Sequence, residues 1–221
     1  MDRNTKKQRV AEAVLDYIDN GESLGIGSGS TVNILIENLS KVKNKIRNVV
    51  SSSIKSSKLL EANGFEVSEL RDVGRLTKYI DGADEVNKDL QMIKGGGGAL
   101  TREKILAHNS NQFICIVDDS KKVDVLGEFP LPIEVIPLSR SSVSLELIKH
   151  GGRPVLRENF VSDNGNLILD VHNLQIMEPI KLEQTINNIP GVVTNGIFAL
   201  DHANVLLCAN DSGVDKTDLN A

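Results

Sequence analysis

The stretch SLGIGSGSTVNILIENL, residues 23–39, decides how the first half of this chain folds. Ser23–Ile26 has the composition of a short buried strand, and the glycine-rich loop 25–31 follows it. Apolar residues then recur at helical spacing from Val32 to Leu39. A strand that leads through a tight glycine turn into a helix is typical of an α/β protein with parallel strands.

The same alternation of strands and helices continues on both sides of this stretch. Apolar residues at helical spacing predict an amphipathic helix over 6–18, which the pair Asn20-Gly21 ends. The remaining predicted strands are 48–52, 65–70, 76–80, 113–117 and 205–209, and the remaining helices are 54–63 and 101–107. This order predicts a doubly wound, mostly parallel sheet with right-handed crossovers.

Beyond residue 128 the order of elements changes. Pro130, Pro132 and Pro137 mark a boundary. After it we expect strands over 133–136, 154–156, 167–171 and 192–200, with helices over 142–150 and 179–189. This βαββαβ order predicts an inserted ferredoxin-like α+β subdomain. We therefore divide the chain into a Rossmann-like catalytic domain, 1–128 and 201–221, and a subdomain, 129–200. The polar tail 210–221 is expected to be loose.

Composition excludes several classes of protein. The 221 residues carry 30 acidic and 25 basic side chains, so the net charge of −5 gives no surface for nucleic acid. The polar start MDRNTKKQRV and the absence of an apolar run of about 20 residues predict no signal peptide and no membrane span. Cys115 and Cys208 lie in apolar runs, which indicates buried reduced thiols and a cytoplasmic protein.

The loop before the second helix is a candidate phosphate site. Backbone amides at a helix N-terminus suit a phosphate, and Ser28, Gly29, Ser30 and Thr31 add hydroxyl groups and space. No lysine precedes Ser30 or Thr31 as in a Walker loop, and the third glycine comes too early for a dinucleotide site. An ordinary strand-to-helix turn has the same sequence, so both interpretations stay open.

The richest chemistry lies in DGADEVNKDLQMIKGGGGALTRE, residues 81–103. Asp81 and Asp84 follow a predicted strand, where open α/β sheets bind their ligands. Two close carboxyl groups push their pKa values apart, so one can hold a proton while the other is ionised. An Asx-rich surface turn is the alternative. The glycines 95–98 can turn their amides toward an anion, although a flexible loop would have the same composition.

Glu103 and two lysines complete the candidate set. Glu103 lies in the first turn of its helix, where the helix dipole favours an ionised acid, so it is a candidate general base or a helix-stabilising residue. Lys94 can stabilise an oxyanion or lie in solvent, and Lys121 can reach a phosphate or the solvent. Asp81, Asp84 and Glu85 are a possible magnesium set, but the neighbouring lysine favours a site without metal.

The chain resembles ribose-5-phosphate isomerase of type A. The matching segments are GSGST (27–31), VSSS (50–53), DGADE (81–85), MIKGGGGALTREK (92–104), DDSK (118–121), FPLPIEVIP (129–137), GGRP (151–154), DNGN (163–166) and IPGVVTNGIF (189–198). The resemblance implies that the chain interconverts ribose 5-phosphate and ribulose 5-phosphate as a homodimer. It implies no metal and no organic cofactor, and the expected partner is a sugar phosphate.

The resemblance also implies roles for individual residues. Glu103 resembles the base that moves a proton between C1 and C2. Lys94 and the amides of Gly95, Gly96 and Gly97 resemble the groups that stabilise the enediolate oxygen. Asp81 and Asp84, with Gly82 and Ala83 between them, resemble the segment that handles hydroxyl protons and ring opening. The phosphate cradle corresponds to Ser28–Thr31, Lys121 and Lys7, although the adjacent Lys6 competes with Lys7 for this role.

Two other classes of function are weighed against the isomerase. A non-catalytic sugar-phosphate sensor needs a DNA-binding segment, and the first helix alone is too short to form a helix-turn-helix. A sugar-phosphate deaminase or acyl-group transferase would release ammonia or form a covalent carboxylate intermediate. An assay for ribulose 5-phosphate formed from ribose 5-phosphate separates the three.

Overall fold

The computed structural model describes residues 1–219, which form two compact units. The first unit comprises Met1–Gly82, Ile105–Lys121 and the described chain from Ala203 onward. The second comprises Ala83–Lys104 and Lys122–His202, so the chain passes between the units four times. The second unit contains the whole of the predicted subdomain 129–200 and adds segments on either side. The predicted boundaries themselves stay a prediction.

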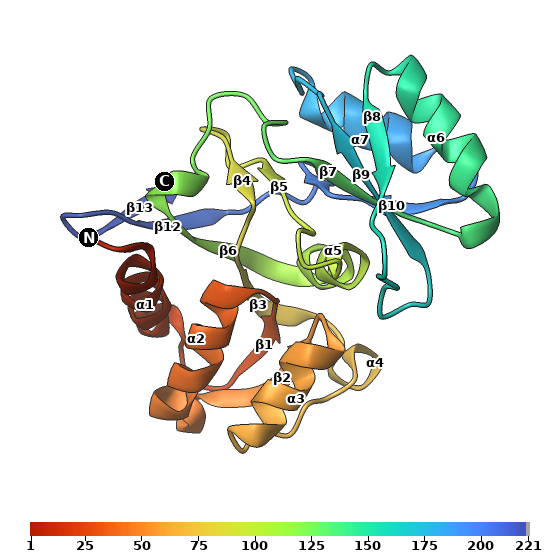
Figure 1. The fold of residues 1–221 in the computed structure, drawn as a ribbon. Helices are drawn as coiled ribbons and strands as arrows, with labels where there is room; N and C mark the ends of the chain where they lie inside the picture. Colours follow the sequence, from red (N-terminus) through yellow and green to blue (C-terminus); the bar gives the residue numbers. More distant parts are fainter. Residues whose placement is uncertain (220–221) are drawn as a thin grey trace. The chain divides into compact units, whose positions relative to one another are not determined.

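The first unit is built on a six-stranded sheet in the order β13-β12-β6-β3-β1-β2 (Figure 1). Its strands are β1 Glu22–Ile26, β2 Ile46–Ser51, β3 Leu76–Asp81, β6 Ser110–Asp118, β12 Val205–Ala209 and β13 Val214–Asp218. The five strands from β12 to β2 are parallel, and β13 is antiparallel to β12. The predicted mostly parallel α/β sheet is therefore confirmed.

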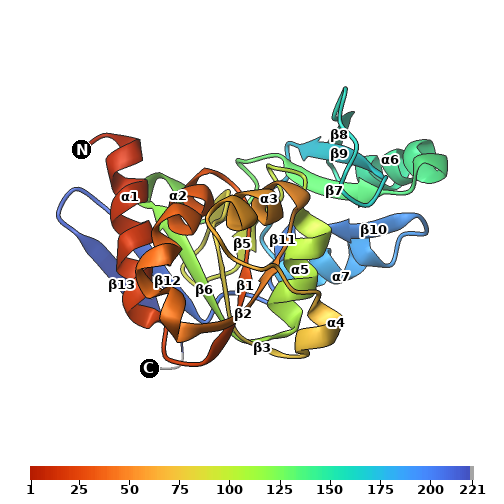
Figure 2. The same ribbon diagram turned by 90° about the horizontal axis from the view of Figure 1, so that it is seen from below.

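Helices cover both faces of this sheet. Figure 2 shows α1 Arg3–Ala13, α2 Ser30–Asn38 and α3 Ile54–Ala62, and one apolar core contains Val10, Val32 and Leu60 from these helices. Strand residues that alternate in direction supply the rest of this core, including Leu24 and Ile26. On the other face Gly25 lies against Leu106 of α5 Leu100–His108. This arrangement is the doubly wound architecture that the alternating sequence predicts.

Two sequence expectations for the first unit are wrong. Residues 65–70 form no strand: they make a single bridge, Val49 to Val67, and then enter the short helix α4 Leu70–Val73. The described part of the tail, 210–219, is not loose, because Asn210 accepts the N–H groups of Ser212 and Gly213 and closes a hairpin into β13, and residues 220–221 lie outside the described residues. Most side chains of β13 are exposed, so this edge strand lacks the apolar alternation that reveals a strand.

The second unit contains the predicted βαββαβ subdomain. Its four-stranded antiparallel sheet has the order β10-β7-β9-β8, which is the ferredoxin-like order (Figure 1). The elements are β7 Leu131–Val135, α6 Arg140–Lys149, β8 Arg153–Leu156, β9 Leu167–His172, α7 Pro179–Asn187 and β10 Val192–Asn195. Ile133, Leu169, Val143 and Ile186 share one core, so α6 and α7 cover one face of the sheet.

The second unit also contains a small sheet. β4 Glu85–Val86, β5 Met92–Ile93 and β11 Ile197–Phe198 pair antiparallel in the order β11-β5-β4. The predicted strand 192–200 is therefore two strands in two sheets, because the chain turns at Gly196. A Cβ at that residue would lie 2.3 Å from the carbonyl oxygen of Lys94. The described 3₁₀ helices are Val14–Tyr17, Leu39–Lys45 and Asp119–Lys121 in the first unit and Pro137–Ser139 in the second.

Candidate active site

The predicted phosphate loop lies at the topological switch point of the first sheet. β1 is hydrogen-bonded to β2 on one side and to β3 on the other, so the crossovers diverge at the carboxyl end of β1. Gly27 follows β1 and donates its N–H to the carbonyl of Ile80 at 3.0 Å. The loop is thereby attached to β3 at the point where Asp81 ends that strand.

Asp81 holds this loop in place. Its fully buried carboxylate accepts the N–H of Ser28 at 3.0 Å and that of Gly82 at 2.7 Å, and it also accepts the Tyr79 hydroxyl. A Cβ at Gly27 would lie 1.9 Å from the Asp81 Cγ, so only glycine fits beside the carboxylate. A carboxylate with several donors in a buried position is a rigid anchor for the turn.

The helix that follows presents the predicted hydroxyl groups. Gly29 has a φ of 98° and precedes the first turn of α2, whose amides point away from the helix. Gly29 and Ser30 are exposed, while Ser28 and Thr31 are partly buried. A helix N-terminus with open amides and hydroxyls matches the requirements of a phosphate.

Lys7, rather than Lys6, joins this loop. The Nζ of Lys7 donates to the Ser30 Oγ at 2.9 Å. Lys6 forms ion pairs with Asp119 at 2.8 Å and with Asp211 at 3.0 Å. The two adjacent lysines therefore have different partners in the structure, and which of them binds a phosphate stays a prediction.

Lys121 ends the short turn that follows β6. Because β6 is parallel to β3, its carboxyl end lies at the same edge of the sheet as Asp81. Next to it, burial acts to raise the pKa of Asp118, but hydrogen bonds from Ser120 and the charge of Arg3 outweigh burial and lower that pKa. Lys121 itself is partly buried. Lys121 therefore lies at the same edge of the first sheet as the loop, and Lys7 contacts the loop through Ser30.

In the second unit the β4–β5 hairpin sets Asp84 beside the glycine loop. Asp84 donates its N–H to Ile93 at 2.8 Å, across the hairpin from Lys94. Its Oδ2 accepts the N–H of Gly96 at 2.7 Å. A Cβ at Gly96 would lie 2.8 Å from the Asp84 Oδ1, so this contact depends on glycine. Gly96 and Gly97 are exposed, whereas Gly95 is buried.

Lys94 and Glu103 form a buried ion pair in the same unit. The Lys94 Nζ lies 3.3 Å from the Glu103 Oε2, and the two side chains are only 3% and 5% exposed. Glu103 lies in the first turn of α5, and Lys94 follows β5 directly. The Lys94 Nζ also lies 5.4 Å from the centroid of the Phe198 ring. A carboxylate and an ammonium are thus fixed side by side next to the glycine loop.

Lys104, the next residue of α5, anchors the helix in this unit. Its Nζ lies 2.5 Å from Glu183 of α7 and donates to the Ile197 carbonyl at 2.6 Å. Glu183 accepts the N–H groups of Ala199 and Leu200, each at 2.9 Å. Burial lowers the pKa of Lys104, against the opposing effect of Glu183. This pair fixes the rotation of α5 and with it the direction of Glu103.

Sequence analysis missed several residues that hold these groups. Tyr79 lies two residues before Asp81 on one strand, so the period of two could have placed both side chains on one face. Glu134 is fully buried and accepts hydrogen bonds from Thr101, Ser162 and Asn166. Its position on β7 opposite α5 had no local signal, because these contacts join distant segments.

Glu85, a member of the possible magnesium set, has other partners among residues 1–219. Glu85 accepts the N–H of Gly127 at 2.7 Å and that of Phe129, so backbone groups occupy its carboxylate. Within the described chain no three His, Cys, Asp or Glu side chains gather as metal ligands. No described helix is long and apolar enough to cross a membrane.

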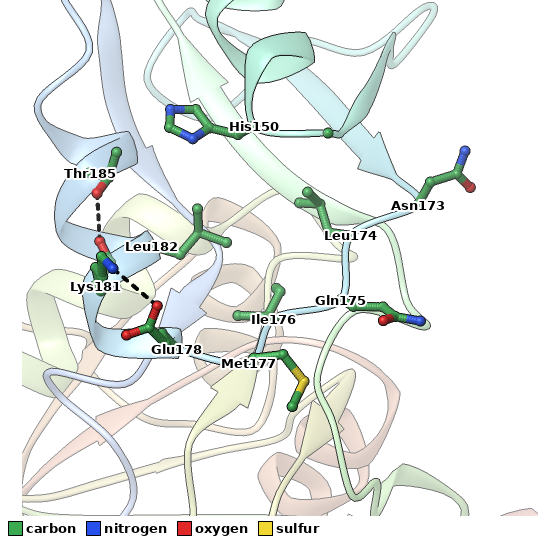
Figure 3. A pocket seen from close by; sticks show the side chains of 11 residues that line it. His150, Asn173, Leu174, Gln175, Ile176, Met177, Glu178, Lys181, Leu182 and Thr185 are labelled. Carbon is green, nitrogen blue, oxygen red and sulfur yellow. Dashed lines mark hydrogen bonds and ion pairs between the residues drawn. The ribbon is translucent and has the colours of Figure 1, made fainter.

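A separate cavity of about 330 Å³ opens on the second unit between the end of α6 and α7 (Figure 3). Its polar groups bond to one another: Lys181 pairs with Glu178 at 3.1 Å, and Thr185 donates to the Lys181 carbonyl at 2.7 Å. None of the predicted site residues lines it. We assign no chemistry to this cavity.

Comparison with known proteins gives consistent results. The family model for ribose 5-phosphate isomerase A (phosphoriboisomerase A) matches residues 48–213. Ribose-5-phosphate isomerase A of Buchnera aphidicola subsp. Acyrthosiphon pisum (strain Tuc7) is 52% identical over 214 residues, which cover 97% of this chain and 96% of the relative.

Solved structures agree with this match. Ribose 5 phosphate isomerase A from Neisseria gonorrhoeae superimposes with a TM-score of 0.96 at 46% identity, covering 98% of this chain and 97% of the other. A D-ribose-5-phosphate isomerase in complex with phospho-erythronic acid gives a TM-score of 0.95 at 35% identity, covering 99% and 100%.

Proposed function

We propose a mechanism for the reaction of this chain. The chain belongs to the ribose 5-phosphate isomerase A family and interconverts ribose 5-phosphate and ribulose 5-phosphate in the pentose phosphate pathway. One observation carries the proposal. The buried pair of Lys94 and Glu103, 3.3 Å apart, lies next to the glycine loop and supplies a base and an electrophile together. An aldose–ketose shift needs both groups, because it removes a proton beside a carbonyl.

Glu103 is the proposed base. In the open-chain aldose, C2 carries the acidic proton and C1 is the carbonyl carbon. The Glu103 carboxylate takes the C2 proton to give the enediolate and returns a proton to C1 to give the ketose. Its place in the first turn of α5 favours the ionised form that this step needs. A positioned base of this kind contributes about 10²–10⁴-fold.

Lys94 and the loop amides stabilise the enediolate oxygen in this proposal. The ammonium of Lys94 is fixed by burial and by its ion pair, so it need not reorganise when negative charge develops. The amides of Gly95, Gly96 and Gly97 add donors that carry no side-chain bulk. One oxyanion donor contributes about 3–4 kcal/mol to the barrier, so several donors and a base together account for substantial catalysis.

Asp81 and Asp84 are the proposed carriers of hydroxyl protons and the groups that open the furanose ring. Gly82 and Ala83, the small residues between them, are partly buried. Asp81 accepts the N–H groups of Ser28 and Gly82, which fix the orientation of its carboxylate. Asp84 is held by Gly96 in the same manner.

The phosphate group is assigned to Ser28–Thr31, Lys7 and Lys121. The hydrogen bond from Lys7 to Ser30 supports this assignment, because it brings an ammonium to the N-terminus of α2. A structural relative is described in complex with phospho-erythronic acid, a phosphorylated acid of the same chemical class as an open-chain sugar phosphate. Binding energy from the phosphate then positions C1 and C2 for proton transfer.

The variant Glu103→Gln tests the base. We expect turnover of ribose 5-phosphate to ribulose 5-phosphate to fall to background, while the affinity for phospho-erythronic acid stays within about threefold, because glutamine keeps the shape and loses the basic oxygen. The matched control is Glu61→Gln on the exposed side of α3, which should retain full activity. A near-normal kcat for Glu103→Gln would refute the assignment.

Three further expectations belong to this proposal: a homodimer, a cytoplasmic location and a reaction without cofactor. The buried reduced cysteines Cys115 and Cys208 support the location, because such thiols suit a reducing compartment. Light scattering coupled to gel filtration tests the dimer, and a mass of one 24.0 kDa chain would contradict it.

A further inference from the structure

Arg157 contacts the glycine loop from outside the predicted set of site residues. Its Nη1 donates to the carbonyl of Gly96 at 3.2 Å and to that of Gly95 at 3.4 Å. Asp170 of β9 accepts from its Nε at 2.8 Å and from its Nη2 at 2.5 Å. All of these residues lie in the second unit. The guanidinium therefore joins a fixed carboxylate to two consecutive carbonyl groups.

These contacts define the direction of the loop amides. The loop has no cis peptide bond, and in a trans peptide the C=O and the N–H point in opposite directions. In the peptide between Gly95 and Gly96, the carbonyl points to Arg157 and the N–H points to Asp84. In the next peptide the Gly96 carbonyl also points to Arg157, so the N–H of Gly97 points away from Arg157.

Consecutive glycines do not keep this arrangement unaided. Glycine rotates into either sign of φ at little cost, and Gly95 and Gly98 already have φ values of 97° and 80°. A peptide flip would turn a carbonyl dipole toward the place where an oxyanion needs an N–H. The bidentate contact with Asp170 removes the freedom of Arg157, so the guanidinium can prevent the flip.

A second contact restrains the same side chain. The Arg157 Cζ lies 5.2 Å from the centroid of the Phe160 ring, and Phe160 packs against Gly98. A Cβ at Gly98 would lie 2.1 Å from the Phe160 Cζ, so the ring closely covers the end of the loop. Arg157 is thus held by a carboxylate on one side and by an aromatic ring beside the loop.

We propose that Arg157, held by Asp170, is a positioning residue for the isomerisation: it keeps the Gly96 amide on Asp84 and the Gly97 amide turned toward the enediolate oxygen. The inference rests on the proposed role of the loop amides as donors to that oxygen. Arg157 acts through the peptide planes and does not itself touch the reacting atoms.

The variant Arg157→Met removes the guanidinium and keeps an unbranched stem. We expect kcat to fall roughly 10–100-fold, since loss of one oxyanion donor costs about 10²–10³-fold and the loop keeps part of its population in the correct orientation. The affinity for phospho-erythronic acid should fall by a similar factor. KM for ribose 5-phosphate and the inhibition constant of inorganic phosphate should stay within about twofold, because phosphate is assigned to the other unit.

Matched variants separate positioning from folding. Arg153→Met changes an exposed arginine on β8, the strand that ends just before Arg157, and should leave kcat unchanged. Asp170→Asn retains the guanidinium but weakens its hold, so it should lower kcat by a smaller factor than Arg157→Met. If Arg157→Met fails to fold, Asp170→Asn and Arg157→Lys replace it in the test. Arg157→Lys should have a lower kcat than the wild type, because an ammonium lacks the planar fork of the guanidinium.

Two results would overturn the inference. One is a kcat of Arg157→Met, or of both substitute variants, within twofold of the wild type. The other is a parallel rise in KM and in the inhibition constant of inorganic phosphate, which indicates general damage. Failure of the proposed catalytic assignment gives a different result: the Glu103→Gln variant would be active, whatever the kcat of the Arg157 variants.

Discussion

Lys6 and Lys7 are consecutive residues with different partners, and the kinetics of single variants can distinguish their roles. We expect Lys7→Met to raise KM for ribose 5-phosphate by roughly tenfold with kcat little changed, because the variant lacks the ammonium beside Ser30 that we propose binds the phosphate. Lys6→Met should leave KM within about twofold, because Lys6 pairs with Asp119 and Asp211. Steady-state kinetics of both variants decides, and a larger rise in KM for Lys6→Met would reverse the assignment.

The ion pairs of Lys6 also fix its response to pH. Hydrogen bonds to Asp119 and Asp211 raise the pKa of Lys6 above 10.5. A lysine whose folded pKa is raised stabilises the fold fully below the unfolded pKa, and this contribution is lost as pH rises through the folded pKa. Lys6 therefore keeps its charge, and its structural role, across the whole range in which an enzyme works.

Sequence was informative about residues whose chemistry is local. Asp81, Asp84 and Glu103 could be selected because each lies at a strand end, a turn or a helix start, and the structure places each there. The different partners of Lys6 and Lys7 could not be predicted, because they depend on how α1 packs against the rest of the first unit. Arg157 could not be selected, because it meets Gly95 and Gly96 from some sixty residues away and its neighbours in sequence carry no motif.

Helix α5 joins the site to α7 through Lys104 and Glu183. We expect Glu183→Ala to lower the free energy of unfolding by about 3–5 kcal/mol, because it leaves the Lys104 ammonium buried without its counter-charge. The double variant Lys104→Met/Glu183→Met should regain much of this loss. Lys181→Met on the same helix is the control: its exposed pair with Glu178 should contribute less than about 1 kcal/mol.

The buried lysine adds a dependence on pH to this experiment. Burial lowers the pKa of Lys104 below 10.5, so between the folded and unfolded pKa values the unfolded chain binds more protons. Stability from this group therefore rises with pH in that window, and Glu183→Ala should strengthen the rise. Urea denaturation at several pH values measures it, and a flat difference between variant and wild type would contradict the argument.

Strands were predictable from sequence where their residues are buried and therefore apolar. β1, β6 and β12 are buried on both sides, and their apolar runs marked them as strands. β13 has mostly exposed side chains and depends on pairing with β12, so its sequence resembled a tail. Residues 65–70 carry apolar groups at strand spacing, yet Val67 makes only a single bridge to Val49.

At the scale of the whole molecule, the proposed chemistry needs no metal ion. Proton transfer is assigned to Glu103, and the oxyanion is assigned to the Lys94 ammonium and to N–H donors. We therefore expect activity to be unchanged after treatment with EDTA and dialysis, as measured by formation of ribulose 5-phosphate. Loss of activity that added magnesium restores would refute this mechanism.

The order of strands in the first sheet affects how the protein is made. β6 lies between β3 and β12, and β12 is almost the last strand of the chain to leave the ribosome. From the synthesis of Asp118 until Val205 emerges, the apolar strand FICIV has one open edge that can pair with another nascent chain. Chaperone binding during translation, and aggregation during refolding of the concentrated protein, are the expected results of this late closure.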